Sequence, residues 1–556
     1  MASHHDHVVV NKNRSQYGTD TLFYKTPDSS WKVLESPNHT NVSSLRSFRN
    51  HLYVAYQFSL FIFDQEMNYA DKLYTYGIDG GLEPRDLYLD ADSTFWIADG
   101  DEGLVKSKGN NDGEFIHPSG PANPSSFDMA TFEDEVWVAS GGYQSDWGGS
   151  FLRNGLYHYQ DNDWISYNDD EYDLFDTIPD IVSIAVKPGT GDKAYAGSWN
   201  KGLIEITNGE ISNIFNKTNS SLQGNVAAPK LIQISGLAFD NESNLWVVNS
   251  GAEEVLSVMK PNGEWRSYSL GSQSSGTFLG DLIIDDFGQK WIIMRDHRIL
   301  VYNDNGTLDN PSDDFVKVLT GSAGNGAIPG SYSVNALAKD LDGNIWIGTD
   351  EGVGVIYNPE DVFSGNNFDA ERPKVEVDGY VQYLLNSENV RAITVDGANN
   401  KWFGTERAGV FLMSPDGTEQ YKHFNEENSP VFSNEISAIA INDKGEVFIG
   451  TSKGIISYEG IAAPGRENNK DIFVYPNPVK SEYNGPIYVI NLVQDANVKI
   501  TDIAGNLVYE TYAEGGKAQW NGRNFNGEEV QTGYYMVFVS NDDGTETIVT
   551  KVLVFR

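Results

Sequence analysis

The sequence contains no cysteine, few basic residues and no long apolar run. Without cysteine, disulfide frameworks, thiolate zinc sites and cysteine nucleophiles are excluded. No window approaches 18 consecutive apolar residues, so no transmembrane segment is predicted. Acidic residues outnumber basic ones by 79 to 39, which gives a formal net charge of −40. A surface this negative repels phosphate backbones, so we expect no nucleic-acid partner, and an anionic ligand would need a local basic or amide-lined pocket.

Recognisable catalytic and metal-binding motifs are also missing. The sequence has no P-loop, H-E-x-x-H, G-x-S-x-G or EF-hand pattern. We therefore predict no catalytic residue, no metal site and no cofactor, and interpret the protein as a non-enzyme. The first residues hold no apolar signal-peptide core, so an exported form would need a leader that precedes them. The cluster of His4, His5, Asp6 and His7 is expected to be disordered or incidental.

The abundant residues point to many short strands. Glycine occurs 55 times, and Tyr, Phe and Trp together occur 68 times. Aromatic side chains suit a half-buried pleated surface, and glycine supplies the positive φ that tight hairpins need. This composition predicts an all-β protein and suits a helical one poorly.

One unit recurs along the chain and is clearest between Val334 and Tyr357 (VNALAKDLDGNIWIGTDEGVGVIY). In that copy apolar residues alternate, Asp342 and Gly343 predict a hairpin turn, and Trp346 follows in the return strand. One such sheet cannot bury both of its faces, so units of this kind must stack. Nine copies occur at spacings of 41 to 58 residues, with these aromatics at the equivalent position: Tyr53, Trp96, Trp137, Tyr195, Trp246, Trp291, Trp346, Trp402 and Phe448.

The unit resembles the two-component regulator propeller repeat, whose hallmark is D-x-D-G-N-apolar-W-apolar-G-T. The resemblance implies β-propeller blades over roughly residues 40–460. Tandem members of that family usually have seven blades per ring. We therefore predict a seven-bladed β-propeller over residues 111–460, with residues 1–110 as the last blades of a preceding, truncated propeller. The alternative is a single larger ring. Propellers host many functions, so this fold identifies no chemistry.

After a polar linker at residues 461–470 the sequence changes character. Short strand-like segments with turn signals every 8 to 12 residues predict an immunoglobulin-like β-sandwich over residues 471–556. Its motifs are Y-P-N-P, V-x-I-x-D-x-x-G-x-x-V, W-x-G, G-x-Y and a terminal Lys-Val strand. The residues assigned to this signal are Pro476, Asn477, Pro478, Asp502, Gly505, Gly533, Tyr534 and Lys551.

In this order the motifs resemble the type A sorting domain of the type IX secretion system of Bacteroidetes. The alternative is a generic immunoglobulin-like appendage. The resemblance implies export to the outer-membrane surface or the extracellular space, with the type IX translocon as a partner.

The most site-like segment is a glycine-rich insertion at residues 141–155 (GGYQSDWGGSFLRNG). Tyr143, Asp146 and Trp147 in this insertion are predicted to be exposed binding residues, and Trp199 is a second candidate. Aromatic side chains on loops at a propeller face commonly stack on sugar rings or contact a partner. The alternative is that these rings pack between blades or over a loop.

Three functions compete. Propeller repeats with a terminal sorting domain resemble an attachment-complex family of the type IX system, which presents anionic lipopolysaccharide to the sortase that anchors cargo, and we favour this function. The second is a periplasmic sugar sensor of a hybrid two-component system, which would continue into a transmembrane helix and a kinase. The third is a secreted propeller that binds or degrades polysaccharide, as a sugar-binding module, lyase or hydrolase, which needs a convergent site that the sequence does not display.

Overall fold

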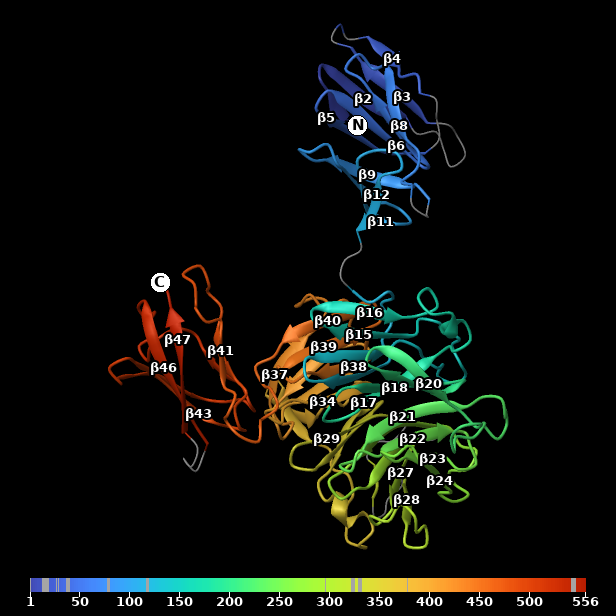
Figure 1. The fold of residues 1–556 in the computed structure, drawn as a ribbon, viewed down its shortest axis with the longest axis vertical. Helices are drawn as coiled ribbons and strands as arrows, with labels where there is room; N and C mark the ends of the chain where they lie inside the picture. The colour runs from blue at the N-terminus through green and yellow to red at the C-terminus, as the bar shows by residue number, and fades with distance from the viewer. Residues whose placement is uncertain are drawn as a thin grey trace. The chain divides into compact units, whose positions relative to one another are not determined.

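The protein is built almost entirely from β-strands (Figure 1). The computed structural model describes residues 2–12, 20–26, 28, 30–36, 41–77, 81–116, 120–295, 297–321, 326–328, 333–377, 379–541 and 547–556. Across these residues the helical elements are two short 3-10 turns, η1 (Asp173–Asp176) and η2 (Pro359–Val362). The all-β prediction is confirmed.

The chain divides into two compact units, residues 1–120 and 121–556. In its described part the first unit holds three four-stranded antiparallel sheets. The first is β1 (Ala2–His4), β2 (His7–Lys12), β3 (Thr21–Lys25) and β4 (Trp31–Val33); the second is β5 (Val42–Phe48), β6 (His51–Tyr56), β7 (Ser59–Phe63) and β8 (Tyr69–Leu73); the third is β9 (Pro84–Leu89), β10 (Phe95–Asp99), β11 (Gly103–Ser107) and β12 (Gly113–Ile116).

The sequence repeat marks only the second and third of these sheets. The first lacks the Asp and Trp pattern, so the search for repeats missed it. Its β1–β2 hairpin contains the histidine cluster, and buried His4 shares a 2.7 Å hydrogen bond between Nδ1 and the hydroxyl of Ser47. The start of the chain is therefore an ordered part of a sheet, and the expectation of a disordered or incidental terminus is wrong.

In the described residues of the second unit, seven antiparallel sheets follow one another between residues 128 and 459. In chain order they are β13 (Asp128–Phe132), β14 (Glu135–Ala139), β15 (Leu156–Gln160) and β16 (Asp163–Tyr167); β17 (Ile181–Val186), β18 (Lys193–Ser198), β19 (Gly202–Thr207) and β20 (Glu210–Phe215); β21 (Gln233–Phe239), β22 (Leu245–Ser250), β23 (Leu256–Met259) and β24 (Trp265–Tyr268); β25 (Leu279–Ile284), β26 (Lys290–Met294), β27 (Arg298–Asn303) and β28 (Phe315–Leu319); β29 (Val334–Lys339), β30 (Ile345–Thr349) and β31 (Gly352–Ile356); β34 (Val390–Val395), β35 (Lys401–Thr405), β36 (Val410–Met413) and β37 (Gln420–Phe424); and β38 (Ile436–Ile441), β39 (Glu446–Thr451) and β40 (Gly454–Glu459).

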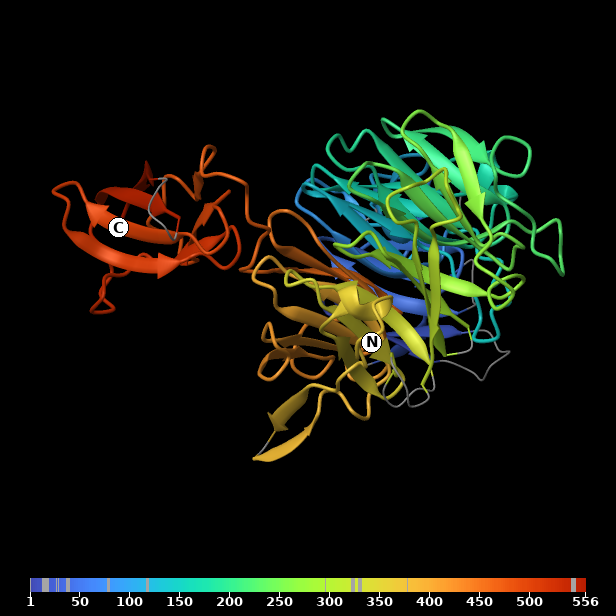
Figure 2. The same ribbon diagram turned by 90° about the horizontal axis from the view of Figure 1, so that it is seen from below.

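A two-stranded hairpin, β32 (Lys374–Val377) with β33 (Tyr380–Tyr383), is inserted between the fifth and sixth sheets. It projects away from the other strands (Figure 2, golden hairpin at the lower left). Tyr380 and Val381 near its tip are 77% and 68% exposed. Val375 of the hairpin is nevertheless 4% exposed and packs in the same apolar cluster as Trp346 and Phe403, so the tip projects while the base contributes to the core.

Small residues let the inner strands of this unit come close together. Ala392 in the first strand of the sixth sheet pairs with Gly404 in the second. A Cβ atom on Gly404 would lie only 2.5 Å from a methyl carbon of Ile436 in the next sheet. Larger apolar side chains fill the wider space further out, as where buried Trp246 packs against Leu282 and Ile292 of the following sheet.

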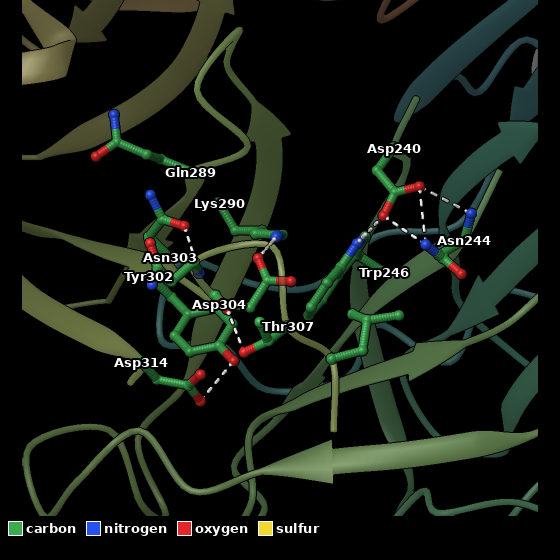
Figure 3. A network of polar contacts seen from close by, with 12 residues as sticks. Asp240, Asn244, Trp246, Gln289, Lys290, Tyr302, Asn303, Asp304, Thr307 and Asp314 are labelled. Carbon is green, nitrogen blue, oxygen red and sulfur yellow. Dashed lines mark hydrogen bonds and ion pairs between the residues drawn. The ribbon is translucent and has the colours of Figure 1, made fainter. Parts of the chain in front are cut away.

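Buried lysines also join neighbouring sheets. Lys290 of β26 lies with its Nζ 3.9 Å from the ring centroid of Trp246 in the preceding sheet, and it pairs with the carboxylate of Asp304 (Figure 3). The indole N–H of Trp246 donates in turn to Asp240 at 2.8 Å. Since a buried ammonium is costly unless it is paired and hydrogen-bonded, Lys290 requires both the ring and the carboxylate to stay in place.

The first and last of the seven sheets contact each other. The hydroxyls of Ser126 and Ser437 share a 2.7 Å hydrogen bond, and the hydroxyl of Thr131 donates to the carbonyl of Ile441 at 3.0 Å. Phe448 of β39 joins the apolar cluster of the first sheet, and Figure 1 shows β15 and β16 beside β39 and β40. The sheets thus follow one another around a ring, as in a β-propeller.

The C-terminal part of the second unit is a β-sandwich. One sheet contains β41 (Phe473–Tyr475), β42 (Ile487–Ile490) and β45 (Ala518–Trp520); the other contains β44 (Leu507–Tyr512), β43 (Asn497–Asp502), β46 (Gly533–Ser540) and β47 (Thr547–Val554). Trp520, which is 1% exposed, lies in the core between them.

The sandwich is hydrogen-bonded to the last propeller strands. Lys517 is 2% exposed, and its Nζ donates to the carbonyl of Gly460 at 2.9 Å and to that of Lys444 at 3.3 Å. The backbone N–H of Gly516 donates to the carbonyl of Ala463 at 2.7 Å. The Nζ of Lys517 also lies 4.2 Å from the ring centroid of Tyr488 in β42, so this side chain connects the segment after β40 to the sandwich.

Candidate functional site

The glycine-rich insertion forms a short ordered hairpin between β14 and β15. The backbone N–H of Gln144 donates to the carbonyl of Gly148, and that of Trp147 donates to Gln144, both at 2.8 Å. Trp147 has a φ of +68°, in the left-handed region that L-residues seldom adopt. The turn therefore holds the indole in a conformation that the surrounding contacts must stabilise.

Asp180, which precedes β17, anchors the base of this hairpin. Its carboxylate accepts hydrogen bonds from the backbone N–H groups of Phe151 at 2.9 Å and Leu152 at 2.8 Å, and from the side-chain amide of Asn200 at 3.2 Å. Asp180 is fully buried, and burial raises its pKa although these three donors oppose the shift. The anchor fixes the insertion against the second sheet.

The structure brings three of the four predicted binding residues together. The ring centroids of Tyr143 and Trp147 lie 4.9 Å apart in a stacked arrangement, and Trp199 lies 4.6 Å from Tyr143. The indole N–H of Trp199 donates to the carbonyl of Trp147 at 3.2 Å. Phe278, before β25, extends the cluster, since its centroid lies 6.3 Å from Trp147. Phe127, just before β13, lies 5.0 Å from Tyr143, so five rings meet at this loop.

The members of the cluster differ in exposure. Trp199 is completely buried, so it packs beneath the insertion, as the alternative reading of the sequence allowed. Tyr143 and Trp147 are half-buried and keep accessible surface. Asp146 is exposed, and its carboxylate accepts the backbone N–H of Gly148 at 2.9 Å. Of the four predicted residues, Tyr143, Asp146 and Trp147 can thus contact a ligand, and Phe278 is half-buried like the two rings.

Two carboxylates that the sequence analysis did not select lie on inner strands near these rings. Asp128 of β13 accepts the backbone N–H of Ile184 in the next sheet at 3.0 Å, and Asp281 lies in the fourth sheet, on β25. Burial and the negative charge of Asp281 raise the pKa of Asp128, and burial raises the pKa of Asp281. Asp281 nevertheless keeps solvent-accessible surface.

The same carboxylates affect the aromatic cluster. Burial, reinforced by Asp281 and Asp128, raises the pKa of Tyr143, whereas Arg391 opposes that shift. Arg391 is itself ion-paired with Glu406. A second cation, Arg295, lies with its guanidinium carbon 5.3 Å from the ring centroid of Phe278, so both carboxylates and guanidinium groups lie near the rings. Asp128 could have been selected from the sequence, because an aspartate stands at a position where the clearest copies have a small residue, Ala336 or Ala392.

The residues assigned to the sorting signal hold the two ends of the sandwich together. Asn477 lies between Pro476 and Pro478, its side-chain amide donates to the carbonyl of Lys551 at 3.0 Å, and its oxygen accepts the backbone N–H of Leu553 at 3.1 Å. These bonds attach the first motif to the terminal strand, β47. The Y-P-N-P motif and the terminal Lys-Val strand therefore form one structural feature.

The remaining signal residues form a turn and a strand pair. Asp502 accepts the backbone N–H groups of Ala504 and Asn506, both at 2.9 Å, and Gly505 between them has a φ of +86°. At the other end, the Nζ of Lys551 lies 5.5 Å from the ring centroid of Tyr534, beside Gly533. The motif positions thus serve the fold of the domain.

Residues 473–554 match the family of secretion system C-terminal sorting domains. The predicted sorting domain is thereby confirmed, and the protein is exported, to the outer-membrane surface or the extracellular space. In the described part of the chain no helix is long and apolar enough to cross a membrane, and no group of three His, Asp or Glu side chains is placed to hold a metal ion. The chain is an exported β-propeller protein that ends in a sorting domain.

Among solved structures the chain is similar to PorZ, an essential bacterial surface component of the type-IX secretion system of Porphyromonas gingivalis. The two are 25% identical with a TM-score of 0.65, over 96% of this chain and 73% of PorZ. The extracellular domain of a one component system from B. thetaiotaomicron (14%, TM-score 0.41, 96% of this chain and 72% of that one) and YCF48 from Cyanidioschyzon merolae (14%, 0.42, 61% and 97%) are more distant. None of the curated proteins compared with the chain matches it.

Proposed function

We propose that this protein is a non-enzymatic cell-surface component of the type IX secretion and attachment machinery, which binds anionic lipopolysaccharide and presents it to the sortase. The sorting domain at residues 473–554 supports passage through the type IX translocon. The likeness to PorZ over 96% of the chain supports a place in the same machinery. In this proposal residues 111–460 act as one seven-bladed propeller, and residues 1–110 belong to a second one.

The observation that carries the binding role is the accessible ring pair of Tyr143 and Trp147. Both rings lie on a loop that is anchored by Asp180, so little conformational freedom is lost when a ligand binds. Flat aromatic faces of this kind pack against the C–H faces of sugar rings. We assign to this loop the recognition of the sugar rings of the glycan and not of its anionic groups, because Asp128, Asp146 and Asp281 repel anions nearby.

Calorimetry of the full chain with purified smooth lipopolysaccharide, and separately with a purified type IX sortase, tests the proposal. We expect saturable binding to both, and a lipopolysaccharide affinity about tenfold lower in Trp147→Ala, because the loss of one stacked ring costs roughly 1–3 kcal/mol. The matched control is Trp31→Ala, which removes a 54% exposed indole elsewhere. No binding of either partner by the wild-type chain would disprove the function.

The second candidate is a polysaccharide-degrading propeller. Asp128 and Asp281 favour it, since two interacting carboxylates with raised pKa values can serve as general acid and base. Incubation with a panel of bacterial polysaccharides distinguishes the two functions. New reducing or unsaturated ends that disappear in Asp128→Asn would establish the enzyme, whereas we expect none.

A further inference from the structure

The N-terminal unit contains a cleft between its second and third sheets. Its volume is about 520 Å³. The floor is apolar and partly aromatic, with residues contributed by five strands of the two sheets: Tyr53, Ile62, Leu73, Leu89 and Phe95. Such a floor suits the C–H face of a sugar better than it suits a free ion.

The rim of this cleft is basic, in a protein with a net charge of −40. Arg49, Lys72 and Lys108 line it together with His51, and the one carboxylate of the lining is Asp71. Asp71 already accepts the backbone N–H of Lys72 at 2.8 Å. Three cations therefore face one carboxylate at this rim.

The rim cations form no ion pair within the described residues, although the hydrogen bond from Trp96 and the charge of Arg49 both lower the pKa of nearby Asp90. Arg49 donates to the hydroxyl of Ser93 at 2.7 Å and to the carbonyl of Asp90 at 3.1 Å, which fixes its guanidinium through uncharged acceptors. Within the described residues no carboxylate lies within ion-pair distance of Arg49, Lys72 or Lys108. Arg46 and Lys106 of the same unit are by contrast ion-paired, with Asp86 and Glu114.

We infer that this cleft binds the phosphorylated part of a saccharide, with the phosphate between Lys72, Lys108 and Arg49 and a sugar ring on the floor. Charge-assisted contacts from several cations can outweigh the distant negative charges, which salt screens beyond about 8–10 Å. The choice of ligand rests on the proposed lipopolysaccharide function, and the cleft supplies the basic pocket that this function requires. The site itself rests on the cleft and its unpaired cations.

Glucose 1-phosphate, inorganic phosphate and glucose are suitable probes in calorimetry of the full chain at low and high salt. We expect saturable binding of glucose 1-phosphate, weaker binding of inorganic phosphate, none of glucose, and weakening by salt. The double variant Lys72→Gln/Lys108→Gln should bind glucose 1-phosphate about tenfold more weakly or worse, since two charge-assisted contacts are lost. The matched control is Lys12→Gln/Lys32→Gln, which removes two exposed charges from the first sheet of the same unit.

The outcomes separate the site from the function. Equal affinity of the two double variants, or no saturable binding of any phosphorylated probe, would overturn the inference. If smooth lipopolysaccharide binds the cleft variant as tightly as the control variant, the anion site is wrong while the proposed function survives. If glucose 1-phosphate binding depends on Lys72 and Lys108 but lipopolysaccharide never binds, the site stands and the proposed function fails. Tighter binding of inorganic phosphate than of glucose 1-phosphate would reduce the site to a phosphate site and contradict the saccharide part.

Discussion

The carboxylate of Asp340 accepts the indole N–H of Trp346, six residues later, at 2.8 Å. Its other oxygen accepts the backbone N–H groups of Asp342 and Asn344, which form the hairpin turn between them. One aspartate thus organises the turn and orients the tryptophan, which gives a physical reason for the D-x-D-G-N-x-W spacing. The same bond recurs between Asp90 and Trp96, Asp240 and Trp246, Asp285 and Trp291, and Asp396 and Trp402.

Replacing Asp340 should destabilise the propeller. Asp340 also lies 3.3 Å from the Nζ of Lys401, which is completely buried, so Asp340→Ala leaves the indole without its acceptor and the ammonium without its counter-ion. Lys401 keeps the oxygens of Asn399 and Pro415 as acceptors, so the loss is that of the charge pair, and we expect the free energy of unfolding in urea to fall by about 3 kcal/mol. The control Glu351→Ala removes an exposed carboxylate nearby. Equal midpoints for the two variants would contradict this role.

His158 should make the propeller sensitive to acid. Its ring stacks on Trp137 with centroids 3.8 Å apart, and burial lowers its pKa to about 4. An unfolded histidine takes up a proton near pH 6.5, so stability is complete above that pH and falls as the pH drops toward 4. Between pH 7 and pH 5 the loss from this group is about 2 kcal/mol. Urea unfolding of His158→Phe and the wild type at both pH values measures it, and an equal pH dependence of the two proteins would refute it.

Trp199 and Trp147 should respond differently to truncation. Trp199→Ala removes a fully buried ring beneath the insertion, and we expect a loss of about 3–5 kcal/mol in unfolding free energy. Trp147→Ala removes a half-buried ring and should cost less than half as much, while it weakens glycan binding. Chemical denaturation together with the calorimetry described above tests both. A larger loss of stability for Trp147 would show that its ring serves packing rather than binding.

Lys517 should control how firmly the sorting domain is held to the propeller. Burial lowers its pKa, and its two carbonyl acceptors belong to Gly460 and Lys444. Lys517→Met leaves both carbonyls without their donor, at about 1–3 kcal/mol. Limited proteolysis should then cut within residues 461–470 several-fold faster, whereas Lys480→Met, an exposed position, should behave as the wild type. Unchanged cleavage would mean that the other hydrogen bonds suffice.

Asn477 should be needed for export through the stability of the sorting domain. Asn477→Ala removes both bonds to the terminal strand, and we expect its cost to be about 2 kcal/mol. In a native host the surface level of the protein should fall toward that of a chain lacking residues 471–556. The control Asn484→Ala changes an exposed asparagine of the same domain. Normal surface levels of the truncated chain would show that the domain is not required.

The sequence predicted the repeating sheets because the turn and the tryptophan come from adjacent residues. The last copy illustrates the dependence, since Asn442 and Phe448 replace Asp and Trp together, and an aromatic without an N–H needs no carboxylate acceptor. The sheet β1–β4 was missed because its residues do not follow this spacing, although β4 begins with Trp31. The assignment of boundaries at residues 110 and 460 stays a prediction.

Only part of the candidate site could be predicted from the sequence. Tyr143 and Trp147 were selected because they lie in one glycine-rich loop. Phe278 and Asp281 lie more than 130 residues further along, and only the contact between sheets places them beside that loop. The basic cleft was missed for the same reason, because Arg49, Lys72 and Lys108 follow no motif and meet only through strand pairing and packing.

The hydrogen bond between Ser126 and Ser437 joins residues 311 positions apart. Contacts of such separation form late in folding, because the entropy of closing the long loop is lost before the contact compensates for it. The strands that complete the ring, β38 to β40, are followed directly by the sorting domain. During synthesis the sorting domain therefore emerges only after the strands β13 to β40 have been made. We expect a prematurely terminated chain to lack both the closed ring and the sorting domain, so that incomplete rings do not reach the cell surface.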